Sequence, residues 1–163
     1  MKPRLFIDCD GVLADFDSKV KELYKKHYHD HKPNEVWGKL TKDVPNFFYH
    51  LDTLPDYIFL ISAIAKYEND YEIGFLTSMP KPTGNLITAA DDKRKWIRKY
   101  IHDTWPIHVV MGWENKKYYI NSDKDILIDD AKRNIEDWRN HGGIGILHTS
   151  AYKTIIELGK VSP

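Results

Sequence analysis

The chain has 163 residues, enough for one domain whose hydrophobic core needs no metal or disulfide staple. Its 24 Lys and Arg residues balance 24 Asp and Glu residues, so no overall field attracts nucleic acid or an anionic membrane. One cysteine excludes an internal disulfide framework. No apolar stretch approaches the ~20 residues of a membrane span, and two acids follow the first apolar run too early for a signal peptide. We therefore expect a cytoplasmic protein that binds its ligands through local groups.

The first part of the chain alternates between short apolar runs and segments of helical periodicity. Residues 5–7 form an apolar run that predicts a buried strand, followed by Asp8, Asp10 and Gly11. Apolar residues between 16 and 28 recur at helical spacing. The pattern then predicts a short helix over 35–40, a buried helix over 56–66 and a strand over 71–76.

The second part continues this alternation. Residues 81–92 predict a loop, which precedes a helix with Trp96 on its inner face. A later helix stops at Gly142-Gly143, and the last helix begins at Ser150 and is closed by Gly159. The remaining apolar runs predict strands over 107–111, 126–128 and 144–147. Strands that alternate with helices in this way are typical of an α/β fold with a parallel sheet covered on both faces.

One segment departs from this rhythm. About forty residues, 16–56, separate the first strand from the next core element, far more than a crossover connection needs. They are helical and aromatic in character. We therefore expect a single domain, 1–163, with a small helical cap at about 16–56, inserted over the carboxyl ends of the strands, where open α/β sheets bind their ligands.

Polar side chains follow three of the predicted strands at the point where each strand ends. These residues are Asp8 and Asp10, Thr77 and Ser78, and Asp129 and Asp130. A buried sheet has no other use for such side chains, and all of them fall on the side where a ligand should bind. The sequence therefore predicts that they converge on one functional site.

The residue types indicate phosphoryl chemistry. Because side chains alternate along a strand, Asp8 and Asp10 should point the same way, and two converging acids repel unless a cation or proton lies between them. Mg²⁺ prefers oxygen ligands and neutralises a phosphoryl group. One carboxylate can attack phosphorus to give an aspartyl phosphate, while a second protonates the leaving oxygen and then activates water. Thr77 and Ser78 offer donors to phosphate oxygens, and a lysine is expected to add a positive charge.

The ordered set of motifs resembles that of haloacid-dehalogenase (HAD) phosphatases. The matching segments are Asp8-Cys9-Asp10-Gly11-Val12, Phe75-Leu76-Thr77-Ser78, a following lysine, and Leu127-Ile128-Asp129-Asp130. Within that superfamily the chain resembles the 5′(3′)-deoxyribonucleotidase family. Residues 8–16 match its D-x-D-G-V-L-A-D-F opening, residues 46–55 match N-F-F-x-x-L-x-x-L-P, and residues 95–100 match K-W-x-x-K-Y.

This resemblance implies a Rossmann-like HAD fold with a parallel five-stranded sheet, and a Mg²⁺-dependent phosphatase that hydrolyses (deoxy)ribonucleoside monophosphates. It implies that Asp8 is the nucleophile and Asp10 the general acid/base. The implied magnesium ligands are Asp8, the backbone carbonyl of Asp10, Asp129 and Asp130. The implied substrate contacts are Thr77, Ser78 and the lysine for the phosphate, and Phe16, Phe47 and Phe48 for the base.

Two lysines, Lys116 and Lys117, precede the fourth strand and compete for the phosphate-binding role. Counting back from Asp129 favours Lys117, while counting from the preceding strand favours Lys116; we favour Lys117. The sequence also departs from the family, because Met79 stands where a proline usually follows Thr-Ser, and Asp56-Tyr57 stands where Gly-Ala is usual.

Two other functions compete with a nucleotidase. One is a 3′-phosphatase on nucleic-acid ends, which would need a basic groove; the dense basic run for it is Lys93-Arg94-Lys95 with Arg98-Lys99. The other is a catalytically silent nucleotide-binding module. We expect the main binding partner to be a small nucleotide, and we expect neither a membrane nor a nucleic acid as partner. Whether the protein forms a homodimer is left open.

Other chemical side chains have structural interpretations. His27, His29 and His31 lack a partner set that would complete a zinc site. Cys9 lacks the arginine that a cysteine phosphatase needs and is expected to pack in the core. Trp37 and Trp113 are the tryptophans expected to contact a ligand.

Overall fold

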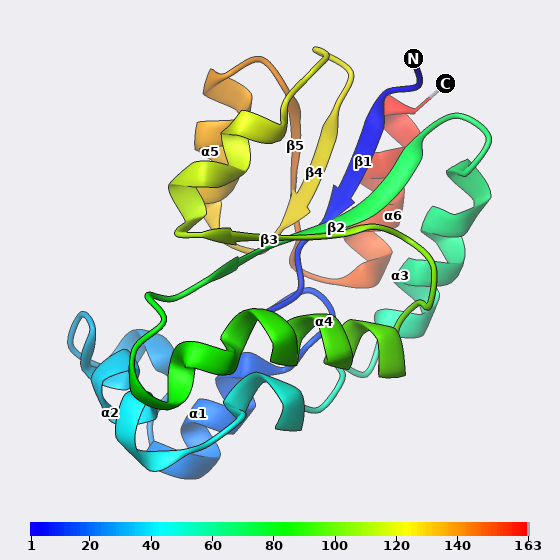
Figure 1. Ribbon diagram of the computed structural model, residues 1–163. Helices are drawn as coiled ribbons and strands as arrows, with labels where there is room; N and C mark the ends of the chain where they lie inside the picture. The colour runs from blue at the N-terminus through cyan, green and yellow to red at the C-terminus, as the bar shows by residue number, and fades with distance from the viewer. Residues whose placement is uncertain (163) are drawn as a thin grey trace.

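A computed structural model describes residues 1–162 and contains one five-stranded sheet, in which every strand runs parallel to its neighbours (Figure 1). The strands are β1 (Arg4–Ile7), β2 (Glu72–Met79), β3 (Ile107–Met111), β4 (Ile126–Asp129) and β5 (Ile144–Leu147). Their order across the sheet is β3-β2-β1-β4-β5. The predicted parallel five-stranded α/β fold is therefore confirmed, and β1 lies at the centre of the sheet.

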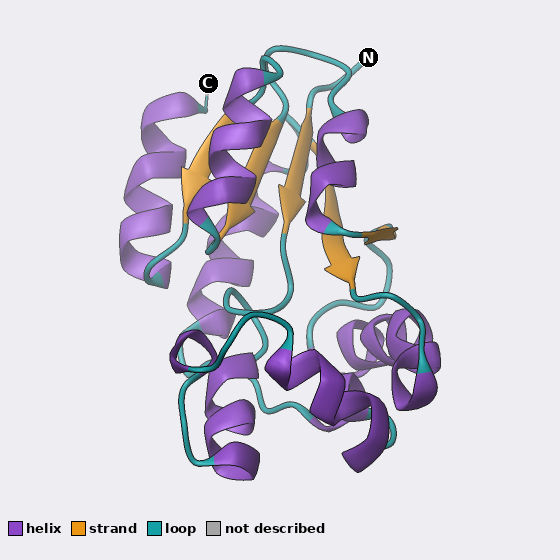
Figure 2. Cartoon of the chain, turned by 90° about the vertical axis from the view of Figure 1, so that its left-hand side faces the viewer, coloured by secondary structure: helices purple, strands orange, loops and turns teal. Residues whose placement is uncertain are grey.

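Helices cover both faces of this sheet (Figure 2). In chain order, the α-helices within residues 1–162 are α1 (Phe16–Tyr24), α2 (Glu35–Asp43), α3 (Tyr57–Ile64), α4 (Ala89–Tyr100), α5 (Lys132–Asn140) and α6 (Ala151–Val161). Helix α5 packs on one face through Ile135 and Trp138, which contact Phe6 and Leu127 of the sheet. Helices α3 and α6 pack on the other face, in a larger core that includes Leu5 and Ile7. No helix within residues 1–162 combines the length and the apolar character needed to cross a membrane.

The segment predicted as a cap lies beyond the carboxyl ends of the strands (Figures 1 and 2). It contains α1, the short helix η1 (Tyr28–Asp30), α2 and the short helix η2 (Phe47–His50). Helix α4 also lies on this side of the sheet. The short helix η4 (Gly84–Thr88), which precedes α4, packs on α2, where Gly84 is so close to the Thr41 carbonyl that a Cβ would collide with it. The structure over the strand ends thus includes residues 80–100 as well as 16–56.

Hydrogen bonds of buried side chains join helix α4 to the cap. The Trp96 indole donates to the Leu51 carbonyl at 2.7 Å. The buried Asp92 carboxylate accepts from Asn46 at 3.0 Å and from Thr88 at 2.8 Å. Because an unpaired polar group costs stability in such a setting, these bonds fix the position of residues 46–51 relative to α4.

The prediction of a loop over 81–92 is wrong from Gly84 onward, where the short helix η4 begins. Helix α4 already begins at Ala89, and Asp91 and Asp92 lie in its first turn. Acidic residues stabilise a helix N-terminus through the helix dipole, but the same residues are common in turns. The composition of this stretch therefore did not separate a loop from the start of a helix.

Two further helix predictions need correction. In α3 the buried residues are Leu60, Ile61 and Ile64, whereas Ile58 and Phe59 are 52% and 68% exposed. A segment that is apolar all round gives no periodicity from which its inner face can be deduced. Helix α6 continues to Val161, so Gly159 lies inside it and does not close it. The prediction of Ser150 as N-cap is confirmed, since its side chain accepts from the Lys153 amide at 3.2 Å.

Candidate active site

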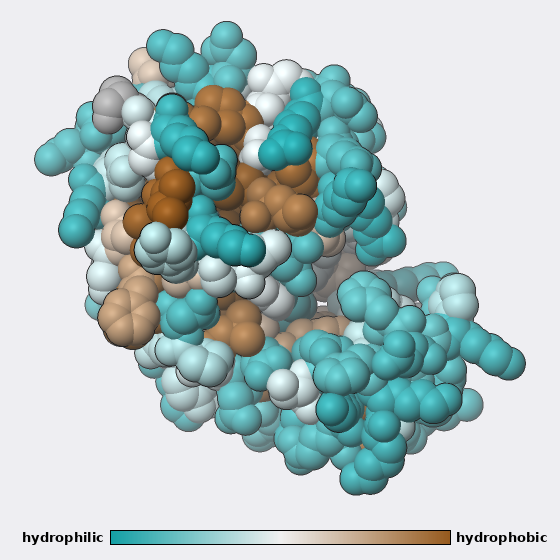
Figure 3. All heavy atoms as spheres, turned by 180° about the vertical axis from the view of Figure 1, so that it is seen from behind, coloured by the Kyte–Doolittle hydropathy of each residue, from teal (hydrophilic) through white to brown (hydrophobic). Residues whose placement is uncertain are grey.

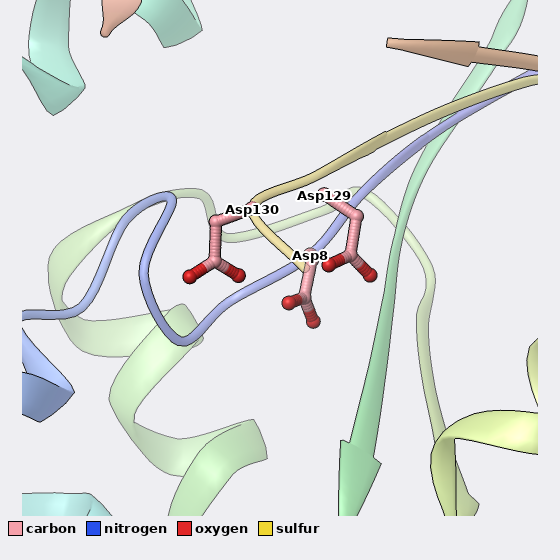
Figure 4. A group of neighbouring side chains, drawn as sticks. All are labelled: Asp8, Asp129 and Asp130. Carbon is pink, nitrogen blue, oxygen red and sulfur yellow. The ribbon is translucent and has the colours of Figure 1, made fainter. Parts of the chain in front are cut away.

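Three carboxylates from two neighbouring strands meet at the carboxyl edge of the sheet. Asp8 follows β1, Asp129 is the last residue of β4, and Asp130 comes next. The Asp8 amide continues the ladder by donating to the Ile128 carbonyl at 2.9 Å, which sets the two strand ends side by side. One oxygen from each of the three acids lies within 4.8 Å of the others, and Figure 4 shows all three side chains pointing to the same side. We call Asp8, Asp129 and Asp130 the acidic triad.

The turn after Asp8 leaves room for Asp130. Gly11 has a φ of +79°, a conformation that favours glycine. A Cβ at this position would collide with the Asp130 carboxylate. Gly11 therefore allows the strand-to-helix turn and the Asp130 side chain to share the same space.

A buried lysine bridges two members of the triad. Lys116 Nζ lies 2.9 Å from Asp8 Oδ1 and 2.6 Å from Asp129 Oδ2. The Asp129 carboxylate also accepts hydrogen bonds from the Ala131 amide at 2.8 Å and from Asn134 Nδ2 at 2.9 Å. Asp129 thus holds Lys116 in place, while the carboxylates of Asp8 and Asp130 face the cleft described below.

We favoured Lys117 as the lysine that binds phosphate, but the structure places this residue elsewhere. Lys117 lies outside the triad and pairs with Asp137 at 3.6 Å. Both lysines belong to the short helix η5 (Trp113–Tyr119), in which neighbouring side chains point in different directions. The count back from Asp129 spanned an irregular connection, so it did not determine which lysine faces inward.

The two lysines offer a matched pair of variants. For the phosphatase reaction that the sequence predicts, we expect Lys116→Met to lower kcat by about a hundredfold or more, because it removes the cation beside Asp8. It should also lower the free energy of unfolding by about 3 kcal/mol, since two buried acids lose their partner. Lys117→Met should change kcat less than threefold. Steady-state kinetics and urea unfolding of both variants check this, and a reversed order of effects would contradict it.

The acidic triad carries more negative charge than its surroundings neutralise. Burial, together with Asp129, raises the pKa of Asp8 to about 6, although Lys116 opposes this shift. Asp130 as a whole residue is exposed, but its carboxylate lies against Gly11, and burial there together with Asp8 raises its pKa to about 8. Burial lowers the pKa of Lys116, but the attraction of Asp129 and Asp8 outweighs it, so the pKa is raised. One lysine therefore does not compensate three carboxylates.

This donor set fits a divalent cation. Carboxylate oxygens from two strand ends are the ligands that Mg²⁺ prefers, and a cation would compensate the buried charge and the repulsion that together raise both carboxyl pKa values. Asp8 and Asp130 are the side chains with oxygens to offer, because both oxygens of Asp129 already accept hydrogen bonds. The Asp10 side chain lies outside the triad, and any contribution from it would come from its backbone carbonyl.

Asp10 pairs with a buried lysine that the sequence did not single out. Lys93, on α4, is 1% exposed and lies 2.5 Å from Asp10 Oδ2 and 3.2 Å from Thr77 Oγ1. Burial lowers the pKa of Lys93, but Asp10 more than compensates, so the pKa is raised. Lys93 precedes the buried Trp96 and Ile97 by three and four positions, a spacing that places it on the inner face of α4. That spacing could have indicated from the sequence that Lys93 faces inward. The other basic residues of the same run suggested a solvated face instead.

A cleft of about 1210 Å³ separates the strand ends from the cap, and Figure 3 shows the recess from behind. Its floor is formed by four of the predicted site residues, Asp8, Asp10, Ser78 and Asp130. Thr77 is 1% exposed and lies beneath this floor, against Lys93. The structure therefore brings the predicted residues Asp8, Asp10, Ser78 and Asp130 to one cavity.

The cap side of the cleft is an aromatic wall, formed by Phe16, Tyr28, Trp37 and Phe48. The ring of Trp37 lies 5.6 Å from Phe16 and 6.4 Å from Phe48, and its indole donates to the Tyr28 hydroxyl at 3.1 Å. At these distances the rings touch each other and leave no space between them. A flat ligand would therefore stack on the surface of the wall.

The structure places some of the predicted aromatic residues in the wall of the cleft. Phe16 and Phe48 line the cleft, and so do Trp37 and Trp113. Phe47 is 1% exposed and does not line it; its ring packs behind Phe48 at 5.2 Å. Phe47 and Phe48 are consecutive residues of η2, so one ring faces the cleft and its neighbour faces the core.

The remaining candidates have structural roles. His27 Nδ1 lies 2.5 Å from Asp17, and His31 Nδ1 lies 3.4 Å from Glu35, so both pair with acids of the cap. Cys9 is 2% exposed in the main core, as predicted. Burial raises the pKa of its thiol well above the usual value, which keeps it unreactive.

Comparison with known proteins supports the fold. No protein-family model matches the sequence, and neither does any curated protein. Among solved structures, the chain is similar to a HAD family enzyme from Bacteroides thetaiotaomicron, with a TM-score of 0.52 and 15% sequence identity. The match covers 91% of this chain and 94% of that chain. At this level of identity the similarity shows the fold, and the chain therefore has the fold of a HAD enzyme.

Proposed function

We propose that the protein is a Mg²⁺-dependent phosphatase of HAD type that hydrolyses nucleoside monophosphates, as 5′(3′)-deoxyribonucleotidases do. The observation that carries this proposal is the position of Asp8, on the floor of the cleft, between Lys116 and Asp130. Asp8 Oδ1 pairs with Lys116, which leaves Oδ2 for attack on phosphorus. A Mg²⁺ ion held by Asp8 and Asp130 would supply positive charge beside the transferring phosphoryl group.

The chain's own residues account for both halves of the reaction. Asp8 forms a bond to phosphorus as the bond to the leaving oxygen breaks, and Asp10 gives its proton to that oxygen. Water then attacks the aspartyl phosphate, Asp10 takes a proton from the water, and the bond between Asp8 and phosphorus breaks. Ser78, Thr77 and Lys116 offer donors to the phosphoryl oxygens.

The aromatic wall favours a substrate with a flat ring beyond its phosphate. Stacking on an aromatic face accepts every base, so this wall supports nucleotides as a class without selecting one base. The alternative of nucleic-acid ends has less support, because Lys93 is buried against Asp10 and is removed from the basic run that a groove would need.

A phosphate-release assay tests the proposed function. The panel contains deoxy- and ribonucleoside 5′- and 3′-monophosphates, sugar phosphates and 3′-phosphorylated oligonucleotides, each with Mg²⁺ and with EDTA. We expect release from mononucleotides in Mg²⁺ alone. Release confined to oligonucleotides would favour the end-processing alternative, and tight mononucleotide binding without release would favour a silent binding module.

The aromatic wall gives a separate prediction. Trp37→Ala should raise KM for nucleoside monophosphates about tenfold with little change in kcat, since stacking contributes roughly 1–3 kcal/mol per base. KM for glycerol phosphate, which has no base, should stay unchanged. Tyr152→Ala is the matched control, because this tyrosine is 75% exposed on α6, away from the cleft. Equal changes in KM for both substrates would exclude stacking on Trp37.

A further inference from the structure

Lys93 is a buried cation whose position the reaction alone does not explain. Its helix, α4, lies on the cap side of the strand ends, and its side chain is 1% exposed. Burying an ammonium group is costly unless hydrogen bonds and an opposite charge compensate it. Its neighbours Arg94 and Lys95 on the same helix are exposed. The burial of Lys93 therefore calls for a specific set of partners.

The Lys93 ammonium contacts three groups at once. It lies 2.5 Å from Asp10 Oδ2, 3.2 Å from Thr77 Oγ1 and 4.2 Å from the centre of the Phe48 ring. An ammonium group has three N–H donors, so two reach oxygen atoms while the charge also lies over an aromatic face. These contacts link the aromatic wall, the β2 strand and the turn after β1 through one atom.

The contact with Asp10 makes its two oxygens different. Oδ2 is held by Lys93, whereas Oδ1 is buried and has no hydrogen-bond partner within residues 1–162. Asp10 also lines the floor of the cleft. Lys93 therefore fixes the orientation of the Asp10 carboxyl group at the floor of the cleft by holding Oδ2.

The contact with Thr77 has a similar consequence. A hydroxyl group that accepts a hydrogen bond from a lysine cannot donate its own hydrogen to that lysine. Thr77 Oγ1 accepts from Lys93, so its hydrogen is directed to another acceptor. In the proposed reaction that acceptor is a phosphoryl oxygen.

We propose that Lys93 is a positioning residue that fixes the orientation of the Asp10 carboxyl group and directs the Thr77 hydroxyl toward the phosphoryl group. This inference rests on the proposed phosphatase function. Lys93 itself forms no bond with the substrate. The hydrogen bonds that join α4 to residues 46–51 keep the lysine at this place.

The leaving-group dependence of Lys93→Met tests this role. A nucleoside monophosphate expels an alkoxide that needs a proton, whereas p-nitrophenyl phosphate expels an aryl oxide that needs little help. We expect kcat for the nucleotide to fall about a hundredfold or more, and kcat for p-nitrophenyl phosphate to fall less than tenfold. KM should rise for both substrates, because Thr77 loses its orientation. Lys95→Met, on the exposed face of α4, is the matched control and should leave all constants unchanged.

A double-mutant cycle gives a second readout. In an Asp10→Asn background the further substitution Lys93→Met should lower kcat for the nucleotide less than threefold, because the side chain that Lys93 orients no longer transfers a proton. Independent, additive losses in this cycle would overturn the inference. Equal losses of kcat for the two leaving groups would overturn it as well, since a purely structural lysine would affect both alike.

The remaining outcomes are also decisive. If Lys93→Met does not fold, Lys93→Gln, an uncharged donor, takes its place in the same assays; if neither variant folds, the lysine is structural and the inference fails. If the wild-type protein is active and Lys93→Met leaves kcat and KM unchanged for both substrates, this inference alone is overturned. A wild-type protein without phosphatase activity overturns the proposed function and this inference with it.

Discussion

Asp8→Asn is expected to abolish phosphate release, with kcat at least roughly a thousandfold below that of the wild-type protein, because an amide does not replace the attacking carboxylate. The fold should remain intact. Burial, together with the neighbouring carboxylates, raises the pKa of Asp8 to about 6, so replacing it with a neutral residue of the same size removes both a buried charge and repulsion from the acidic triad. Lys116 keeps a carboxylate partner in Asp129. The inactive variant should therefore unfold at a temperature equal to or above that of the wild type.

Kinetics and thermal unfolding of the same preparations check this prediction. Asp123→Asn is the matched control, since Asp123 is exposed and makes no contact with the triad, and it should keep the wild-type kcat. Mass spectrometry after rapid quenching should detect a phosphorylated wild-type chain and none in Asp8→Asn. Substantial turnover by Asp8→Asn would place the nucleophile elsewhere and remove the basis of the proposed mechanism.

The strand-end residues could be predicted from the sequence because they depend on regular geometry. Parallel strands bring their carboxyl ends to one edge, so acids after two apolar runs must lie close once the strands are neighbours. Asp8 and Asp129 satisfy this condition through the pairing of β1 with β4. The same reasoning located the cap segment, since a long helical insertion after the central strand begins at that edge.

The lysines and the aromatic wall depend on irregular structure, which leaves a weaker trace in the sequence. Whether Lys116 or Lys117 faces inward is decided by the phase of the short helix η5, and whether Phe47 or Phe48 faces the cleft is decided by η2. Neither element has a periodicity long enough to show its inner face. Lys93 lies on a regular helix, but its charge suggests a solvated residue until Asp10 is seen beside it.

Mg²⁺ should raise the melting temperature of the protein, and the increase should be larger at pH 8 than at pH 5.5. The pKa values of Asp8 and Asp130 are raised from 3.8 to about 6 and about 8, so the folded protein binds these protons more tightly than the unfolded chain does. Their contribution to stability is present below pH 4 and is lost as the pH rises through the folded values, between pH 4 and 8. A cation bound by the same carboxylates competes with protons and restores that stability. At a hundred times its Kd, a bound ion contributes about 2.7 kcal/mol, a shift of roughly 5–10 °C for a chain of this size.

The variant Asp130→Asn tests whether Asp130 is responsible for the effect of Mg²⁺ on the melting temperature. This variant should melt at a higher temperature than the wild type at pH 8 without metal, because one of the repelling charges is gone, and Mg²⁺ should then shift its melting temperature by less than about 2 °C. Asp123→Asn should behave as the wild type does. Differential scanning calorimetry at pH 5.5 and pH 8, with Mg²⁺ and with EDTA, measures all of these shifts. A shift of equal size at both pH values, or one that survives in Asp130→Asn, would mean that the ion binds somewhere other than the acidic triad. The uncompensated negative charge of the acidic triad thus has two effects. It lowers the stability of the metal-free protein, and it gives the triad its affinity for a cation.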